Sequence, residues 1–196
     1  FENLVLDKIN LTFNINETEK IYVNKINIYG NSVTEESVIR NQLEIDEGDP
    51  FNEILFNKSI NNIQSLGIFK KVETKVQEGS QDRFKIIDLD VEERPTGEIS
   101  VSAGFGTQGG TIGAGIKENN FLGKGINLNT SLELTEDSVK GQFVYAKPNF
   151  NYSDNTLFTS LKSSSSDFLT DSGYKTSELG FSVGTRFEQF QNIYLS

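Results

Sequence analysis

The sequence predicts two parts with different folds: a small α+β domain in the first half and a run of antiparallel β-strands in the second. Three observations support this prediction. Of the 17 glycines, 13 follow Pro95, whereas 18 of the 28 acidic residues precede it. Before Pro95 the apolar residues follow both strand and helix periods. After it they alternate with small or polar residues, so we place the domain boundary within 93–97.

The first element is a strand over 21–29 that stops at Gly30, followed by a short helix. Thr34 is of the residue type that caps helices, and Glu35 and Glu36 follow it in the first turn. We expect this helix to run to about Leu43. The acidic segment 46–50 then breaks it, and we interpret that segment as a solvated turn and not a calcium loop, since no EF-hand spacing follows.

A second helix and two strands complete this domain. Asn52 is its predicted N-cap, and Gly67 is the predicted residue just past its end. Strands over 69–76 and 84–92 follow, which gives the order β-α-α-β-β. Ile86 and Ile87 interrupt strict alternation in the last strand, as expected for a strand with neighbours on both sides.

The second half contains six predicted strands and the start of a seventh. They cover 98–106, 110–118, 126–134, 139–147, 156–163 and 175–187, and the seventh begins at Ile193. One face is apolar and the other is small or polar, as in the first strand, where Ile99, Val101, Ala103 and Phe105 alternate with Ser100, Ser102 and Gly104. A transmembrane barrel and a soluble sandwich share this alternation. The many glycines and the drop in charge favour the barrel.

Gly104, Gly106 and Gly109 have the spacing of a dinucleotide-binding loop, which must open a helix. The residues that follow have period two and include further glycines, which helices disfavour. These glycines therefore predict a hairpin turn between two strands.

Composition argues against several classes of function. The chain has 196 residues and no Cys, His, Trp or Met, so zinc fingers, disulfide frameworks and cysteine or histidine catalysis are unsupported. Its net charge of −10 argues against a nucleic-acid surface. The cluster Asp88, Asp90, Glu92 and Glu93 could form a carboxylate site of an enzyme. However, Asp88, Asp90 and Glu92 lie on one strand face without a partner base, and we interpret them as a solvated surface. We expect no catalytic residues, no metal and no cofactor.

Several short segments of the sequence resemble motifs of the BamA family of outer-membrane-protein assembly factors. In the first half these are 28–31, 47–48, 66–69 and 91–93, in an order similar to that of a POTRA domain. In the second half they are 96–97, 104–107, the turn 120–125 and 147–150. The resemblance implies that 1–19 end a preceding POTRA domain, 20–94 form a POTRA domain, and 95–196 form the first strands of an outer-membrane barrel.

The resemblance also implies a function and two sites. The function is insertion of β-barrel proteins into the outer membrane, with the POTRA part in the periplasm. Its implied partners are unfolded outer-membrane proteins, accessory lipoproteins, periplasmic chaperones and outer-membrane lipid. The first site is the edge of the first barrel strand, formed by Gly97, Ile99, Ser100, Val101, Ser102, Ala103, Gly104 and Phe105. The second is the POTRA edge strand, formed by Lys71, Val72, Glu73, Thr74 and Lys75, whose charges also suit simple protection against aggregation.

Some family features are absent, and alternatives stay open. The Val-Arg-Gly-Phe loop motif and a terminal strand ending in an aromatic residue are missing, and the chain stops at Ser196 within a strand. Because membrane barrels need about eight strands, we expect an internal piece of a longer protein and an open, curved sheet. A translocation-assembly or two-partner secretion transporter shares POTRA domain and barrel, and a passive pore is a further alternative.

Overall fold

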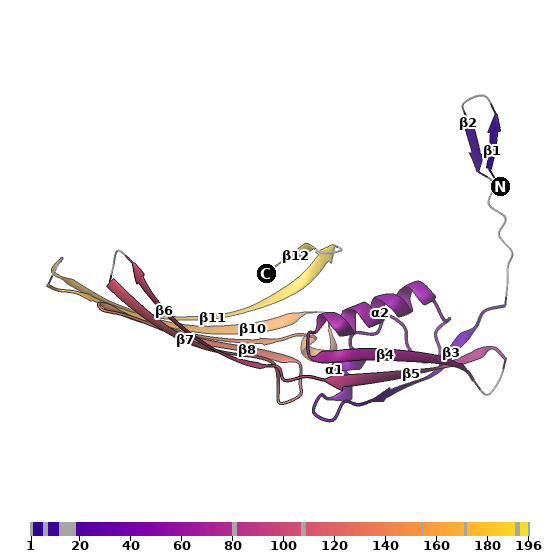
Figure 1. Cartoon of the computed structure of the whole chain (residues 1–196), viewed down its shortest axis with the longest axis horizontal. Helices are drawn as coiled ribbons and strands as arrows, with labels where there is room; N and C mark the ends of the chain where they lie inside the picture. The colour runs from indigo at the N-terminus through magenta and orange to yellow at the C-terminus, as the bar shows by residue number, and fades with distance from the viewer. Residues whose placement is uncertain are drawn as a thin grey trace.

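The computed structural model describes residues 2–5, 8–11, 19–79, 82–106, 109–153, 155–170, 172–190 and 193–195. Its strands form three sheets: a two-stranded, a three-stranded and a seven-stranded one. The two-stranded sheet pairs β1 (Glu2–Val5) with β2 (Lys8–Leu11) in antiparallel register. The assignment of 1–19 to a preceding domain stays a prediction. Figure 1 shows the three-stranded sheet and its helices at one end of the long strands of the large sheet.

The first domain has the predicted order β-α-α-β-β. Its elements are β3 (Tyr22–Tyr29), α1 (Glu36–Arg40), α2 (Glu53–Ser65), β4 (Phe69–Glu78) and β5 (Phe84–Glu93). The sheet order is β3-β5-β4, with β3 parallel and β4 antiparallel to β5. The central position of β5 confirms the interpretation of Ile86 and Ile87.

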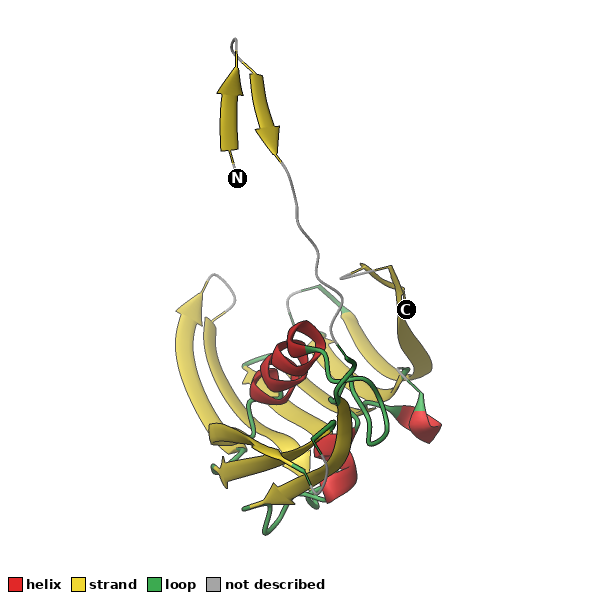
Figure 2. Cartoon of the chain, turned by 90° about the vertical axis from the view of Figure 1, so that its right-hand side faces the viewer, coloured by secondary structure: helices red, strands yellow, loops and turns green. Residues whose placement is uncertain are grey.

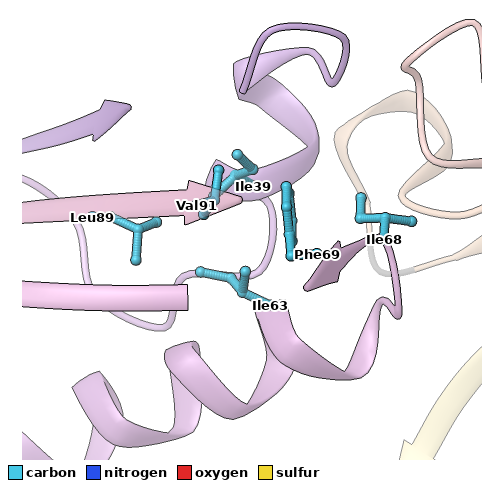
Figure 3. Close-up of a cluster of buried hydrophobic side chains, with 6 residues drawn as sticks. All are labelled: Ile39, Ile63, Ile68, Phe69, Leu89 and Val91. Atoms are coloured by element: carbon cyan, nitrogen blue, oxygen red, sulfur yellow. The ribbon is translucent and has the colours of Figure 1, made fainter. Parts of the chain in front are cut away.

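Apolar side chains from the sheet and both helices form the core of this domain. Figure 3 shows one cluster of buried side chains, which consists of Ile39, Ile63, Ile68, Phe69, Leu89 and Val91. A second cluster contains Val23, Ile26, Ile45, Phe56 and Ile87. Both helices therefore cover the same face of the sheet. The opposite face carries polar residues such as Asn27 and Asp88, with Tyr22, Phe84 and Ile86 toward one end.

The ends of α2 are as predicted. The side-chain oxygen of Asn52 accepts hydrogen bonds from the backbone N–H groups of Ile54 and Leu55, at 2.9 and 3.3 Å. Gly67 adopts φ +67°, the left-handed conformation that ends many helices. The helix α1 is shorter than expected, because it ends at Arg40, and Gln42 and Leu43 continue only with tighter backbone hydrogen bonds to Ile39 and Arg40.

All strands predicted in the second half are present and join in one antiparallel sheet. They are β6 (Gly97–Gly106), β7 (Gly109–Phe121), β8 (Ile126–Thr135), β9 (Ser138–Lys147), β10 (Thr156–Phe168), β11 (Tyr174–Phe190) and β12 (Ile193–Leu195), with a short 3-10 turn (Phe150–Tyr152) before β10. Each strand pairs with its neighbours in sequence, so β6 and β12 are the two edges. The sheet is curved and not closed (Figure 2), as expected.

Two features of the large sheet differ from or extend the predictions. The hairpin β10–β11 is longer than expected, because pairing continues to Phe168 and Tyr174, whose rings lie 5.3 Å apart. The glycines at 104, 106 and 109 do form a hairpin, since Gly106 pairs with Gly109, and Thr107 and Gln108 between them lie outside the described residues.

The apolar face of the large sheet is open to its surroundings. Ile99 and Val101 are 81% and 78% exposed, and exposed side chains continue across the sheet at Ile112, Ile116, Leu132, Phe143, Leu161, Leu179, Phe181 and Val183. Within β7 the apolar residues Ile112 and Ile116 are exposed, whereas Gly113 and Gly115 on the other face are half-buried. Among the described strands no second sheet covers the apolar face, as a sandwich would require.

Within the part of the chain that the structure describes, no helix is both long enough and apolar enough to cross a membrane.

Candidate functional site: two strand edges and a domain junction

The predicted site residues of the second half lie along a free strand edge. Among the described strands β6 pairs only with β7, so its other side has no neighbour. Gly97, Ile99, Ser100, Val101, Ser102, Ala103, Gly104 and Phe105 all belong to this strand, and all are exposed. An edge of this kind presents unpaired N–H and C=O groups.

Small residues line one face of this edge on both β6 and the neighbouring β7. Ser100 and Ser102 of β6 stand opposite Gly115 and Gly113 of β7. A Cβ atom at either glycine would lie 2.7 or 2.6 Å from the facing serine Oγ, so only glycine fits these positions without a shift. The serine hydroxyls therefore rest on glycine backbone, and few side-chain contacts hold β6 in place.

The predicted site residues of the first half also lie on an outer strand. Lys71, Val72, Glu73, Thr74 and Lys75 belong to β4, which pairs only with β5 among the described strands. Lys71 Nζ lies 2.7 Å from Glu73, and Lys70 Nζ lies 2.7 Å from Glu92. The hydrogen bond and charge of Glu73 raise the pKa of Lys71, and those of Lys70 lower the pKa of Glu92. This charged surface fits both peptide docking and protection against aggregation.

The opposite edge of the same sheet is closed along the first part of β3. The segment 48–51 pairs with the outer side of β3, where Val23 N–H donates to Asp49 O and Gly48 N–H donates to Val23 O. Further along, Ile26 N–H donates to Glu47 Oε1 at 3.0 Å, and Arg40 Nη2 donates to Ile26 O at 3.0 Å. The acidic segment read from the sequence as a solvated turn therefore also covers a strand edge.

The carboxylates considered for an enzyme site do not converge. Asp88 accepts a hydrogen bond from Asn27 at 2.8 Å, and Glu92 binds Lys70. Glu93 points elsewhere, toward the loop before α1. No group of three or more acidic, His or Cys residues suited to a metal occurs among the described residues.

Sequence reasoning missed a third feature, the contact between the two domains. Thr34 is buried, and its Oγ1 accepts a hydrogen bond from Asn120 Nδ2 of the large sheet at 2.9 Å. The prediction that Thr34 caps α1 is therefore wrong. The N-cap is Glu35, which makes no side-chain cap, and its backbone N–H donates to Gly123 O at 2.8 Å. The Thr34 hydroxyl binds Asn120, 86 residues further along the chain, and not a backbone group of the helix.

Two glycines allow the turn between β7 and β8 to approach the first domain. Gly123 has φ +72°, and a Cβ atom there would lie 2.0 Å from Val33 O. Gly125 has φ +63°, and its Cβ would lie 3.0 Å from Val38. Asn120 Oδ1 also accepts from Gly125 N–H at 2.8 Å, which fixes the turn internally. The turn 120–125 is thus a docking surface for the first domain. Its glycines were the sequence feature from which this close approach could have been predicted.

Glu93 orders the loop that makes this contact. Its carboxylate accepts hydrogen bonds from the backbone N–H groups of Ser32, Val33 and Thr34, the last at 2.6 Å, and from Ser32 Oγ at 2.7 Å. Burial opposes ionisation of this carboxyl, but the hydrogen bonds from Thr34, Ser32 and Val33 outweigh it and lower the pKa of Glu93 to about 2. Glu93 is therefore a structural anion.

The connection between the domains is held at both of its ends. Arg94 Nε donates to Gly67 O at 2.7 Å, at the end of α2. Thr96 Oγ1 donates to Glu118 Oε1 on β7, and the same oxygen accepts from Asn120 N–H at 2.7 Å. The strand β6 therefore starts from a fixed point.

Comparison with known proteins gives three results. Residues 21–94 match the POTRA family, described as the surface antigen variable number repeat. The chain is 33% identical over 128 residues to the outer membrane protein assembly factor BamA of Neorickettsia risticii (strain Illinois), a match that covers 64% of this chain and 17% of that protein. It is 27% identical over 145 residues to BamA of Neisseria meningitidis serogroup B, covering 72% and 18%. The chain thus spans less than a fifth of the length of these two relatives.

Solved structures show the same arrangement of domains. The crystal structure of BamA from Haemophilus ducreyi lacking POTRA domains 1-3 aligns with a TM-score of 0.77 and 25% identity, over 95% of this chain and 36% of that one. CdiB from Escherichia coli aligns with a TM-score of 0.60 and 15% identity, over 88% and 34%, which shows a shared fold alone.

Proposed function

Because the chain belongs to the BamA family, with a POTRA domain that leads into barrel strands, we propose that it assembles β-barrel proteins in the outer membrane by templating a client strand on β6. BamA proteins are outer-membrane proteins with POTRA domains in the periplasm, and the family is not enzymatic. The large sheet therefore belongs to the membrane and the POTRA domain to the periplasm.

The observations that support templating are the position of β6 as the first strand of the large sheet and its shallow small-residue face. In a hairpin with a two-residue loop, the pair that flanks the loop is hydrogen-bonded, and such pairs alternate along the strands. Gly106 and every second residue before it therefore bond to β7. The outward N–H and C=O groups belong to Phe105, Ala103, Val101, Ile99 and Gly97. A client strand that pairs there continues the apolar face of the sheet.

The POTRA domain offers a second edge, and one observation favours it for docking. The turn 48–51, Arg40 and Glu47 close β3 along its first part, whereas β4 keeps its outer backbone groups free among the described residues. An extended client segment in the periplasm can therefore add to this sheet beside β4. Client outer-membrane proteins are the proposed partners of both edges, with accessory lipoproteins and periplasmic chaperones as further proposed partners.

The alternatives have weaker support. Identity to BamA proteins reaches 33%, whereas the CdiB structures share 15% and 17%, so a secretion transporter is the less favoured alternative. A passive pore needs no fixed POTRA junction.

Cysteine cross-linking in the intact protein tests the templating. The chain has no native Cys, so one is placed at Ser100 or Ser102 and another on the last strand of a client. Disulfides form only when Cα atoms approach within about 7 Å. We expect a ladder in which a shift of two residues on β6 moves the best client position by two.

The matched control is Ser160→Cys, which lies within the sheet on β10 and is paired on both sides. It should give no client cross-link. If Ser100→Cys reacts only with the last strand of its own chain during active assembly, β6 is a closed barrel wall and the proposal is wrong.

A further inference from the structure

A cleft lies at the POTRA junction, between α1 and the barrel segment that follows β9. Its lining includes Ser37 and Asn41 from the POTRA side and Lys124, Lys147 and Phe150 from the barrel side. Glu35 lies in the same cleft, with its carboxylate 3.9 Å from Lys124 Nζ. Two cations, a carboxylate, a hydroxyl and an amide thus line one hollow.

The cleft lies where the apolar face of the barrel ends. Lys147 stands directly opposite Leu157 of β10, so both side chains lie on the same face of the sheet. Two and four residues earlier on β9, Tyr145 and Phe143 continue this face away from the POTRA domain. Lys147 is therefore the last residue of a lipid-facing row, at the periplasmic side of the membrane. Long cationic side chains and aromatic rings at this depth are suited to the head-group region.

Lys147 differs from the lysines at the other end of the barrel in having no ion-pair partner among the described residues. Lys140 and Lys175 lie at the hairpins remote from the POTRA domain, 3.2 and 2.9 Å from Glu133 and Asp167. Lys147 instead lies 6.0 Å from the ring centre of Phe150, and none of the described carboxylates is within ion-pair distance of it. In a chain of net charge −10, this cation faces the membrane rim without a close anion.

We propose that this cleft binds the head group of a phospholipid from the periplasmic leaflet, with the phosphate against Lys124 and Lys147. The hydroxyl of Ser37 and the amide of Asn41 are further donors for its oxygens. The acyl chains lie along the row of Tyr145 and Phe143, which a free phosphate ion cannot use. Because POTRA and barrel residues share the lining, the bound lipid ties the domain junction to the membrane. This inference depends on the outer-membrane location and not on templating by β6.

Native mass spectrometry of the intact protein in detergent micelles, with dioleoyl phosphatidylglycerol or dioleoyl phosphatidylethanolamine added, tests the site. If each lysine contributes roughly fivefold to the affinity, Lys124→Gln with Lys147→Gln should weaken lipid binding about 25-fold. The matched pair Lys140→Gln with Lys175→Gln should leave it unchanged. An equal loss in both pairs, or no loss in the first, overturns the proposal. Displacement of the lipid by an equal concentration of inorganic phosphate overturns it too, because the site then binds only an anion.

A second measurement does not need the charge variants to fold. The chain has no Trp, so Phe150→Trp places the one Trp of this chain in the cleft lining, and its emission can be excited apart from that of Tyr. In vesicles of phosphatidylethanolamine and phosphatidylglycerol, lipids brominated near the head group should quench this fluorophore strongly. Lipids brominated at the chain end should quench it weakly. Equal weak quenching by both places the cleft away from lipid and overturns the proposal.

Discussion

At the scale of single residues, one carboxylate has the widest influence. Glu93 accepts hydrogen bonds from the N–H groups of the loop 32–34. In this loop Thr34 binds Asn120, and the Val33 carbonyl lies against Gly123. Such a nest of backbone donors suits an anion better than a neutral amide. The charge of Glu93 thus sets the shape of the surface on which the barrel docks.

Replacement of Glu93 should therefore destabilise the POTRA domain in a pH-dependent way. We expect Glu93→Gln to cost about 2 kcal/mol of unfolding free energy at neutral pH. The folded pKa of about 2 lies below the ordinary value of 4.5. The stabilisation is then complete above about pH 4.5 and is lost as pH falls toward 2. Urea denaturation of residues 20–94 at several pH values should show the two midpoints converging in acid.

The control for this variant is Glu92→Gln on the same strand. Glu92 is exposed and its described ion-pair partner is Lys70, so its loss should leave the denaturation midpoint almost unchanged. A difference between Glu93→Gln and the native domain that is constant from pH 7 to pH 2 would contradict the role of the charge.

Gly67 provides a second test at this scale. Its φ of +67° costs a β-branched residue more than glycine, so Gly67→Val should lower stability by about 1 kcal/mol or more. Gly67→Asn should lose less, because Asn tolerates the left-handed conformation. Denaturation midpoints measure both variants, and an unchanged midpoint for Gly67→Val would mean that the end of α2 does not need this backbone.

At the scale of elements, the two edges of the POTRA sheet differ: the β3 edge is partly covered, and the β4 edge is uncovered among the described residues. The side chains of Arg40 and Glu47 occupy the N–H and C=O of Ile26, so they prevent another strand from pairing with β3. On β4 only charged side chains guard the edge. The asymmetry leaves β4 as the edge at which we propose that a client segment adds.

Removal of this closure should create a new interaction edge. We expect Arg40→Ala with Glu47→Ala to make the isolated POTRA domain self-associate, and sedimentation velocity can measure this against concentration. Glu36→Ala is the control, because it removes the 2.6 Å partner of Arg40 Nε and leaves Ile26 covered. A double variant that stays monomeric like the control would show that the segment 48–51 suffices to protect β3.

Most elements could be predicted from the sequence, because their signals are local. Period-two alternation located the barrel strands, and Asn52 and Gly67 marked the ends of α2. Thr34 could not be assigned this way, since a hydroxyl before a helix looks the same whether it caps that helix or binds Asn120 in another domain. Arg40 and Glu47 likewise act on Ile26 through long-range contacts that no local pattern encodes.

At the scale of the whole molecule, the domain junction is a set of close backbone approaches and not a flexible linker. The turn 120–125 packs on the segment 33–38, which includes the start of α1. Gln42 Nε2 lies 3.5 Å from Asn149 Oδ1, and Arg94 and Thr96 fix the connection. Contacts of this kind hold two domains in one relative orientation. The start of β6 is thereby placed in a defined position relative to the open edge β4.

This rigidity can be tested at Gly123, where the approach is closest. In Gly123→Ala, the new Cβ would lie 2.0 Å from Val33 O and the residue would keep a φ of +72°, so the turn must move away from the POTRA domain. Spin labels on cysteines at Asn61 of α2 and Ser182 of β11 report the domain separation by pulsed electron resonance, with no native Cys to interfere. We expect a narrow distance distribution in the native background and a broader, shifted one in Gly123→Ala. Gly141→Ala, whose Cβ would meet nothing within 4 Å, should match the native distribution. Identical distributions for all three proteins would mean that the turn follows the POTRA domain without fixing it, and the orientation would then depend on the connection at Arg94 and Thr96.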